Sequence, residues 1–417
     1  MVASIRVSAE VKRGRNKLAT TVVLGHAVKH IYNSSLQHSL LPVIGVALGL
    51  SGAQFGALST SMRVTSGVTT MAAGYLGDRF ANRSGLMLAI SLAILGISFF
   101  LLGTATNFWY LFTVMLLVGI GPSLYHPPAI AALSRKFPDR RGFAISLHGT
   151  GGSIGNLIGP VLVGGLLAGT FLILMTWQNV LKLSLIPALI FAVMIYGLMR
   201  NIPTVEEGTN SIGDYFSGLQ ALLRKRTMIM LVILTALRSM GQSAIQTFLP
   251  LYLLKDLGYT PFVVGLYVAG AQVAGVVAQP LMGYLSDRYG RKIVLVPAVT
   301  ALGILYVALR FADPGYQLIV VILAMGSFQY SLHSIFIASA MDVAQGESQS
   351  TVVSLIYGAG FFGVFSPVLA GIIIDATVTQ NAFLYGGVVV LISAVILAMI
   401  KLPKTANQLA ESKSSGG

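Results

Sequence analysis

Residues 283–291 read GYLSDRYGR, and residues 74–83 read GYLGDRFANR, a variant of the same pattern about 208 residues earlier. Each copy follows one long apolar run and precedes another. Nearly the same spacing relates three further pairs, Pro42 and Pro250, His126 and His333, and Pro160 and Pro367. A constant spacing across several apolar runs indicates a duplicated unit, because coincidence would not preserve it.

The apolar runs themselves predict the fold class. Hydrophobic residues form 55% of the 417 and charged residues only 10%, whereas a soluble domain has roughly 25% charged residues. Runs of about twenty residues cross a hydrocarbon core of about 30 Å as helices, because lipid offers the backbone no hydrogen-bond partners. We predict an all-α integral membrane protein. Its twelve transmembrane helices are expected at 19–48, 53–77, 85–103, 108–133, 141–167, 175–199, 228–254, 261–285, 292–312, 316–343, 350–374 and 381–401.

The duplication divides these helices into two pseudo-symmetric six-helix bundles. The first bundle is expected at 19–199 and the second at 228–401, joined by a polar linker at 200–227. Residues 1–18 form a short N-terminal segment, and residues 402–417 form a tail rich in Ser, Gly and Lys.

The net charge of +14 has an uneven distribution along the chain. Basic residues fall in alternate loops and in both terminal segments, which is the positive-inside pattern. It predicts that both termini are cytoplasmic. The short loops between the apolar runs favour the inner membrane of a bacterium as the cell membrane in question. The distribution of basic residues therefore indicates the membrane topology, and no nucleic-acid partner is expected. Membrane lipid is the expected surrounding of the chain. The chain has no cysteine, and we predict neither a cofactor nor a metal site.

The motif at 283–291 resembles the Gly-x-Leu-x-Asp-Arg-x-Gly-Arg signature of major-facilitator transporters, and the first copy departs from it at Ala81. LYHP at 124–127 and GGSIGN at 151–156 resemble the fosmidomycin-resistance branch of that superfamily, although His30 stands where this branch usually has a carboxylate. The resemblance implies the major-facilitator fold, alternating access and a monomer. The paired motif residues are expected at the cytoplasmic helix ends, where they would hold one conformation closed. These gating residues are Asp78, Arg79, Asp287 and Arg288.

Ionisable residues within the predicted spans are almost all basic or titratable. All six histidines fall in spans, as do Lys29, Arg63 and Arg238, whereas none of the thirteen carboxylates lies in the middle of a span. A charge at the bilayer centre costs at least about 2.5–3.5 kcal/mol, so such groups indicate function. Unpaired cations favour an anionic ligand, and the planar fork of arginine suits carboxylate or phosphonate oxygens.

Helical periodicity places several of these groups on common faces. His30 and Asn33 share a face of the first span with His26, and Arg238 shares a face of the seventh with Gln242. The repeat spacing also relates His30 to Arg238. The predicted substrate-binding residues are Lys29, His30, Asn33, Arg63, Tyr125, His126, Arg238, Gln242, Tyr330 and His333.

These patterns predict a secondary transporter of a small organic anion, with antibiotics among the candidates, and not an enzyme. Histidine titrates near physiological pH, so His30, His126 and His333 are the expected proton carriers for export by proton antiport. The alternative is an importer of organic acids or organic phosphates, or an anion exchanger that uses the same cations. No His-Glu-x-x-His cluster of a membrane protease is present, and two halves with paired motifs favour alternating access over a channel.

Overall fold

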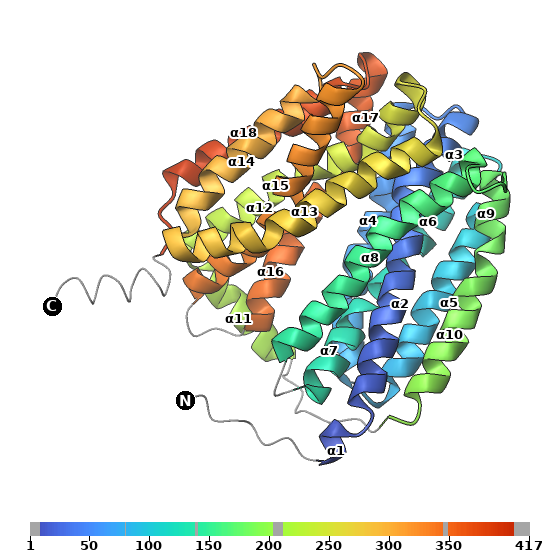
Figure 1. Ribbon diagram of the computed structural model, residues 1–417. Helices are drawn as coiled ribbons and strands as arrows, with labels where there is room; N and C mark the ends of the chain where they lie inside the picture. Colours follow the sequence, from blue (N-terminus) through green and yellow to red (C-terminus); the bar gives the residue numbers. More distant parts are fainter. Residues whose placement is uncertain (1–8, 80, 138–140, 203–211, 345–348, 404–417) are drawn as a thin grey trace. The chain divides into compact units, whose positions relative to one another are not determined.

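The computed structural model describes residues 9–79, 81–137, 141–202, 212–344 and 349–403, and within them every regular element is helical (Figure 1). The first series of elements is α1 Ala9–Lys12, α2 Arg15–Ser35, η1 Leu36–Leu40, α3 Leu41–Ala47, α4 Gly52–Arg79, η2 Ala81–Arg83, α5 Ser84–Leu102, α6 Phe108–Ser123, α7 His126–Lys136, α8 Arg141–Ala168, α9 Trp177–Leu183 and α10 Leu185–Met199. The second series is α11 Ile212–Leu223, α12 Arg226–Leu251, η3 Tyr252–Asp256, α13 Pro261–Tyr289, α14 Arg291–Ala308, α15 Tyr316–Ala344, α16 Gln349–Phe361, η4 Phe362–Phe365, α17 Ser366–Ala376 and α18 Asn381–Met399. The all-α prediction is confirmed.

Several predicted spans consist of two or more consecutive helical pieces. The predicted span 19–48 comprises α2, the π-helical segment η1 and α3. The predicted span 108–133 comprises α6 and α7, which meet at Leu124 and Tyr125. His126 therefore begins a new helix just after a break, in a sequence that continues with Pro127 and Pro128. Proline fits the first turn of a helix, because its missing N–H would have no partner there.

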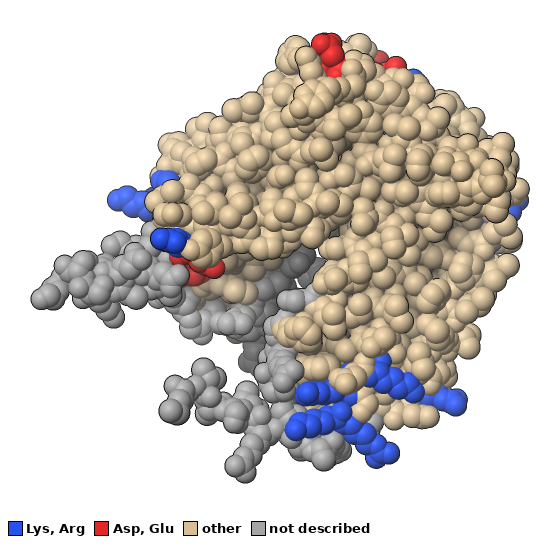
Figure 2. Space-filling model, in the orientation of Figure 1, with Lys and Arg blue, Asp and Glu red and all other residues tan. Residues whose placement is uncertain are grey.

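Ten helical stretches of the described chain are long and apolar enough to cross a membrane. The predicted spans 19–48 and 53–77 are helical but are not among these ten, because polar side chains interrupt both. Large apolar side chains elsewhere face outward, and Val193 and Val277 are each 72% exposed. On the face seen in Figure 2, charged side chains gather near helix ends and leave wide uncharged surfaces between them. Such surfaces suit contact with lipid.

The chain divides into two compact units. Unit 1 contains Met1–Leu50, Ser61–Thr209 and Tyr259–Leu266, and unit 2 contains Ser51–Thr60, Asn210–Gly258 and Tyr267–Gly417. The start of α4 therefore belongs to unit 2, and the start of α13 belongs to unit 1. The bundle limits predicted at 19–199 and 228–401 remain predictions.

Within unit 1, α2 packs most extensively against α8. A Cβ atom added to Gly155 of α8 would lie 2.3 Å from the backbone oxygen of Ala27, so only glycine permits this approach. Gly152 is also close to α2, since a Cβ there would lie 2.8 Å from the His26 ring. Small residues bring helix backbones together in membranes. Here they bring the polar face of α2 against α8.

Candidate functional site

Four histidines from three helices of unit 1 gather around Lys29. His26 and His30 lie on α2, His126 begins α7, and His148 lies on α8. The ring centroid of His26 is 4.6 Å from that of His30, 4.7 Å from that of His126 and 3.6 Å from that of His148, on which it stacks. We call these four residues the histidine cluster.

Hydrogen bonds fix which nitrogen carries the proton on two of the rings. His26 Nδ1 lies 2.6 Å from the backbone oxygen of His148, and a carbonyl can only accept, so Nδ1 donates. His26 Nε2 then bears the lone pair, and it is buried with no hydrogen-bond partner. His30 Nδ1 donates in the same way to Asn156 Oδ1, at 2.9 Å. Both rings therefore keep Nε2 available as an acceptor or ligand.

Lys29 is the cation of this cluster. Its side chain is 2% exposed, and its Nζ lies 2.5 Å from His126 Nε2. An ammonium group donates, so the lone pair of His126 Nε2 accepts this hydrogen bond. No carboxylate of the described chain pairs with Lys29. The burial of an uncompensated charge costs several kcal/mol, and this cost is what an anionic ligand would relieve.

The other predicted unit 1 residues have different surroundings. Asn33 is half-buried on α2, one turn beyond His30. Arg63 lies on α4 as an electrostatic neighbour of His38. Tyr125 is fully buried, and its hydroxyl donates to the backbone oxygen of Val22 at 2.9 Å. The hydroxyl of Tyr125 thus ties the α6–α7 junction to α2, and its ring lies 5.9 Å from that of His26.

Arg238 is the buried cation of unit 2. It lies on α12 and is 3% exposed, and its Nη1 donates to Gln242 Oε1 of the next turn at 2.7 Å. Its guanidinium carbon lies 5.6 Å from the centroid of the Phe336 ring. Arg238 Nε is buried without a hydrogen-bond partner. Among the described residues no carboxylate pairs with Arg238. Its guanidinium instead contacts the neutral amide of Gln242 and the face of the Phe336 ring.

His333 and Tyr330 lie on α15, and both are half-buried. His333 is an electrostatic neighbour of Arg238. Tyr330 packs against α13, where a Cβ added to Gly275 would lie 2.5 Å from Tyr330 Cβ. The structure thus gathers Lys29, His30 and His126 within unit 1, and Arg238, Gln242 and His333 within unit 2.

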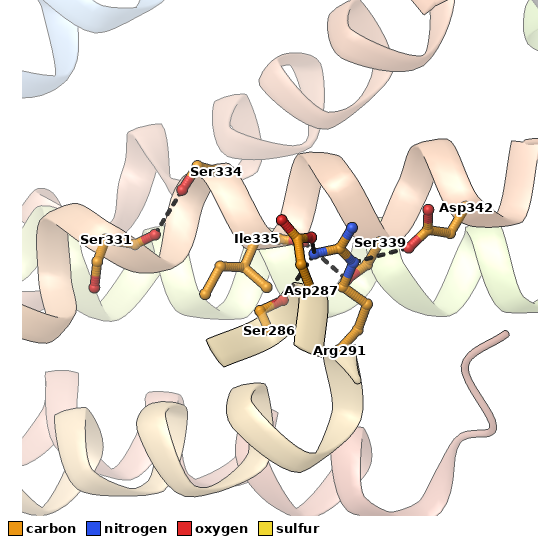
Figure 3. Close-up of polar contacts among 8 residues, drawn as sticks. All are labelled: Ser286, Asp287, Arg291, Ser331, Ser334, Ile335, Ser339 and Asp342. Atoms are coloured by element: carbon orange, nitrogen blue, oxygen red, sulfur yellow. Dashed lines mark hydrogen bonds and ion pairs between the residues drawn. The ribbon is translucent and has the colours of Figure 1, made fainter. Parts of the chain in front are cut away.

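The second motif copy forms a polar network at the junction of α13 and α14 (Figure 3). Arg291 donates through Nε to Asp342 Oδ2 of α15 at 2.8 Å and through Nη1 to Ser286 Oγ at 2.9 Å. It also pairs with Asp287. Arg288 Nη1 donates to Tyr284 Oη at 2.8 Å. The network joins three helices through Arg291.

The set of predicted gating residues is incomplete at this network. Arg291 and Asp342 were not predicted as gating residues, although Arg291 closes the motif at 283–291 and could have been found there. Asp78 and Arg79 end α4, and their side chains lie outside the described residues.

Asp375, a carboxylate near the end of a predicted span, also has partners. Its oxygens accept from the backbone N–H groups of Gly52 at 2.5 Å and Ala53 at 2.9 Å, at the start of α4. All of these residues belong to unit 2. A carboxylate at a helix N-terminus satisfies orphan donors and the helix dipole. Asp375 is therefore a helix cap.

The sequence analysis named His30 and His126 but did not name His26 and His148 as site residues. The signal for His26 was available, because it shares a helical face with His30. His148 lies about 120 residues away on α8, and only the packing of α8 on α2 brings it to the cluster.

Comparison with known proteins identifies transporters. A multidrug resistance protein, MdtG of Yersinia enterocolitica, is 27% identical over 302 residues, which cover 68% of this chain and 69% of MdtG. The fosmidomycin resistance protein of Escherichia coli K12 is 20% identical over 358 residues, which cover 84% of this chain and 86% of that protein.

The fold is shared with solved transporter structures. The nucleoside transporter NupG aligns with a TM-score of 0.71 and 16% identity, over 92% of this chain and all of the NupG chain. The likeness covers both units. At 16% identity this likeness shows the fold alone.

The family itself follows from the sequence profile that matches. The profile described as Major Facilitator Superfamily matches residues 30–252 and again residues 231–416, which together cover most of the chain. The two matches overlap at residues 231–252. The chain therefore belongs to the major facilitator superfamily of membrane transporters.

Proposed function

We propose that the protein is a secondary active transporter that exports a small organic anion of phosphonate or carboxylate type by alternating access, in exchange for protons. One observation carries the proposal. Each unit buries a cation, Lys29 in unit 1 and Arg238 in unit 2, and no described carboxylate pairs with either. An anion is the ligand class that such cations favour.

The contacts of Arg238 support an oxygen-rich anion. Its Nη1 is occupied by Gln242, whereas its Nε is buried without a partner. The planar fork of arginine pairs with two oxygens of one carboxylate or phosphonate. Because Gln242 accepts through Oε1, its amide nitrogen remains a donor. Arg238 and Gln242 can therefore present donors to the same anion.

Export is supported by the relatives, which include multidrug and fosmidomycin resistance proteins. Among the described residues no carboxylate lies mid-helix beside the buried cations, so histidines are the proposed groups for proton antiport. His30, His126 and His333 are the proposed proton carriers, of which His333 belongs to unit 2, like Arg238. The basic residues of alternate loops support cytoplasmic termini in a bacterial inner membrane.

A second candidate uses the same cations without protons. An exchanger, or an importer of organic acids or organic phosphates, needs fixed positive charge, and neither Lys29 nor Arg238 pairs with a carboxylate in the described part of the chain. In this case one anion would replace another on the cations during the transport cycle. The gating residues, with Arg291 added, would serve either candidate.

Binding to the purified protein tests the proposal. Thermal stabilisation is measured with phosphonates, carboxylates, organic phosphates and lipophilic cations, for the wild type and for Arg238→Ala. Stabilisation by anions that Arg238→Ala loses supports the proposal. Stabilisation by cations that Arg238→Ala retains refutes it.

Transport in proteoliposomes then separates the two candidates. An imposed pH gradient drives uptake of the stabilising anion if protons are exchanged. Uptake that requires an internal anion and ignores the pH gradient indicates an exchanger. The variant His333→Gln is expected to weaken the response to the pH gradient and to leave anion binding within a few-fold of the wild type.

A further inference from the structure

We propose that His26, His30 and His126 form a binding site for a divalent transition-metal ion, with Zn²⁺ as the expected occupant. The inference does not rest on the proposed function, since it concerns nitrogen ligands within unit 1 alone. One ring nitrogen from each of the three histidines lies within 4.8 Å of the other two.

The ligand set has the right chemistry for such an ion. Three imidazoles suit zinc, copper and nickel, whereas magnesium and calcium prefer oxygen ligands. Zn–N distances of about 2.0–2.1 Å in a tetrahedral site place the nitrogens roughly 3.3 Å apart. Small rotations of the rings about their side-chain bonds would close the remaining gap. Three protein ligands leave a fourth position open, as in zinc sites that bind water or a further ligand.

The surroundings of the rings have the arrangement that supports metal ligands. A metal-bound histidine usually donates its other N–H to a carbonyl or carboxylate oxygen, which fixes the ring and its tautomer. His26 Nδ1 donates to the backbone oxygen of His148, and His30 Nδ1 donates to Asn156 Oδ1. Both bonds leave Nε2 as the ligand atom. His26 Nε2 is buried and has no partner, which is costly unless a ligand completes it.

Lys29 is expected to oppose metal binding, so its substitution provides a specific test of the metal site. Its Nζ occupies the lone pair of His126 Nε2, at 2.5 Å. A metal ion at this nitrogen must displace the ammonium group, and it must tolerate the nearby positive charge. Both effects weaken metal binding. Removal of the lysine charge should therefore strengthen it, whereas loss of a lysine that merely supports the fold would not.

The probe is Co²⁺ or Zn²⁺ added to the metal-stripped, tag-free protein in detergent. Co²⁺ gives a visible absorption spectrum whose intensity reports four-coordinate geometry, and Zn²⁺ is measured by competition with a chromophoric chelator. One ion per chain is expected for the wild type. The variants His26→Gln and His30→Gln should each lose at least tenfold in affinity. Asn156→Leu should lose roughly 10–100-fold, because it removes the acceptor that orients a metal-binding histidine.

Two further variants keep the test decisive. Lys29→Met is expected to bind the metal at least several-fold more tightly than the wild type. His38→Gln removes a histidine of unit 1 outside the cluster, whose Nδ1 is also buried, and it should bind like the wild type. Equal metal affinity in the wild type and in the double variant His26→Gln/His30→Gln, with both proteins folded by circular dichroism, would overturn the proposal. Absence of binding to both wild type and Lys29→Met would also overturn it.

Discussion

The buried cations Lys29 of unit 1 and Arg238 of unit 2 differ in chemical type and in the groups that they contact. Lys29 of unit 1 donates to an imidazole and is surrounded by the histidine cluster. Arg238 of unit 2 donates to a neutral amide and lies against the Phe336 ring. Arginine stays charged in proteins, whereas lysine and histidine can lose a proton. Arg238 thus carries a fixed charge, whereas the charge of Lys29 depends on its surroundings.

The largest effect is expected at the fixed charge. Arg238→Ala should lower anion affinity on the order of 100-fold, because loss of one partner of a buried, hydrogen-bonded charge pair costs roughly 2–5 kcal/mol. Titration calorimetry with the stabilising anion provides the measurement. Arg238→Lys is the matched control, since it keeps the charge and removes the fork, and an intermediate loss is expected. Equal affinity in Arg238→Ala and the wild type would contradict the comparison.

A smaller effect on anion binding is expected at the adjustable charge. Lys29→Met should lower the affinity for the anion roughly tenfold. Charged hydrogen bonds contribute about 1.5–3 kcal/mol, and hydrogen bonds from the neighbouring histidines can replace part of that energy. The same variant should bind Zn²⁺ more tightly. Opposite changes for the two ligands would separate a direct effect from misfolding. A parallel loss of both would show that Lys29 mainly supports the fold.

The histidine cluster also depends on the packing of α2 against α8. The contact between Arg238 and Gln242 does not depend on helix packing, because both residues lie on α12. Gly155→Ala should destabilise the protein by about 1–3 kcal/mol, since its Cβ would overlap the backbone of α2. Gly149→Ala on the same helix is the control, because nothing lies within 4 Å of the added Cβ. Thermal unfolding in detergent should show a lower midpoint for Gly155→Ala only. Equal midpoints would mean that the α2–α8 approach is looser than described.

The smallest effect on binding is expected at the helix-end network. Arg291→Gln breaks the contacts to Asp342 and Asp287, which are partly exposed, so stability should change by about 1 kcal/mol or less. Anion affinity should stay within twofold, whereas the transport rate in proteoliposomes should fall. Unchanged transport would remove Arg291 from the proposed gating residues.

The sequence predicts the all-helical membrane fold well, because membrane helices are specified by length and apolarity. It also predicts that Lys29, His30 and Arg238 lie within the helices. It does not predict the hydrogen bond of Lys29 to His126 or the stacking of His26 on His148. These contacts depend on how α7 and α8 are rotated and placed against α2. The hydrophobic periodicity does not define that rotation when a helix is apolar around most of its surface.

The most direct test of the account compares one phosphonate with its neutral diester on the wild-type protein. The two compounds share a scaffold and differ in charge and in oxygen acceptors for the buried cations. We expect the phosphonate to raise the unfolding temperature and the diester not to, with at least a tenfold difference in affinity by calorimetry. Equal binding of the two compounds would contradict the proposal, because binding would then not depend on the negative charge that Lys29 and Arg238 are proposed to recognise.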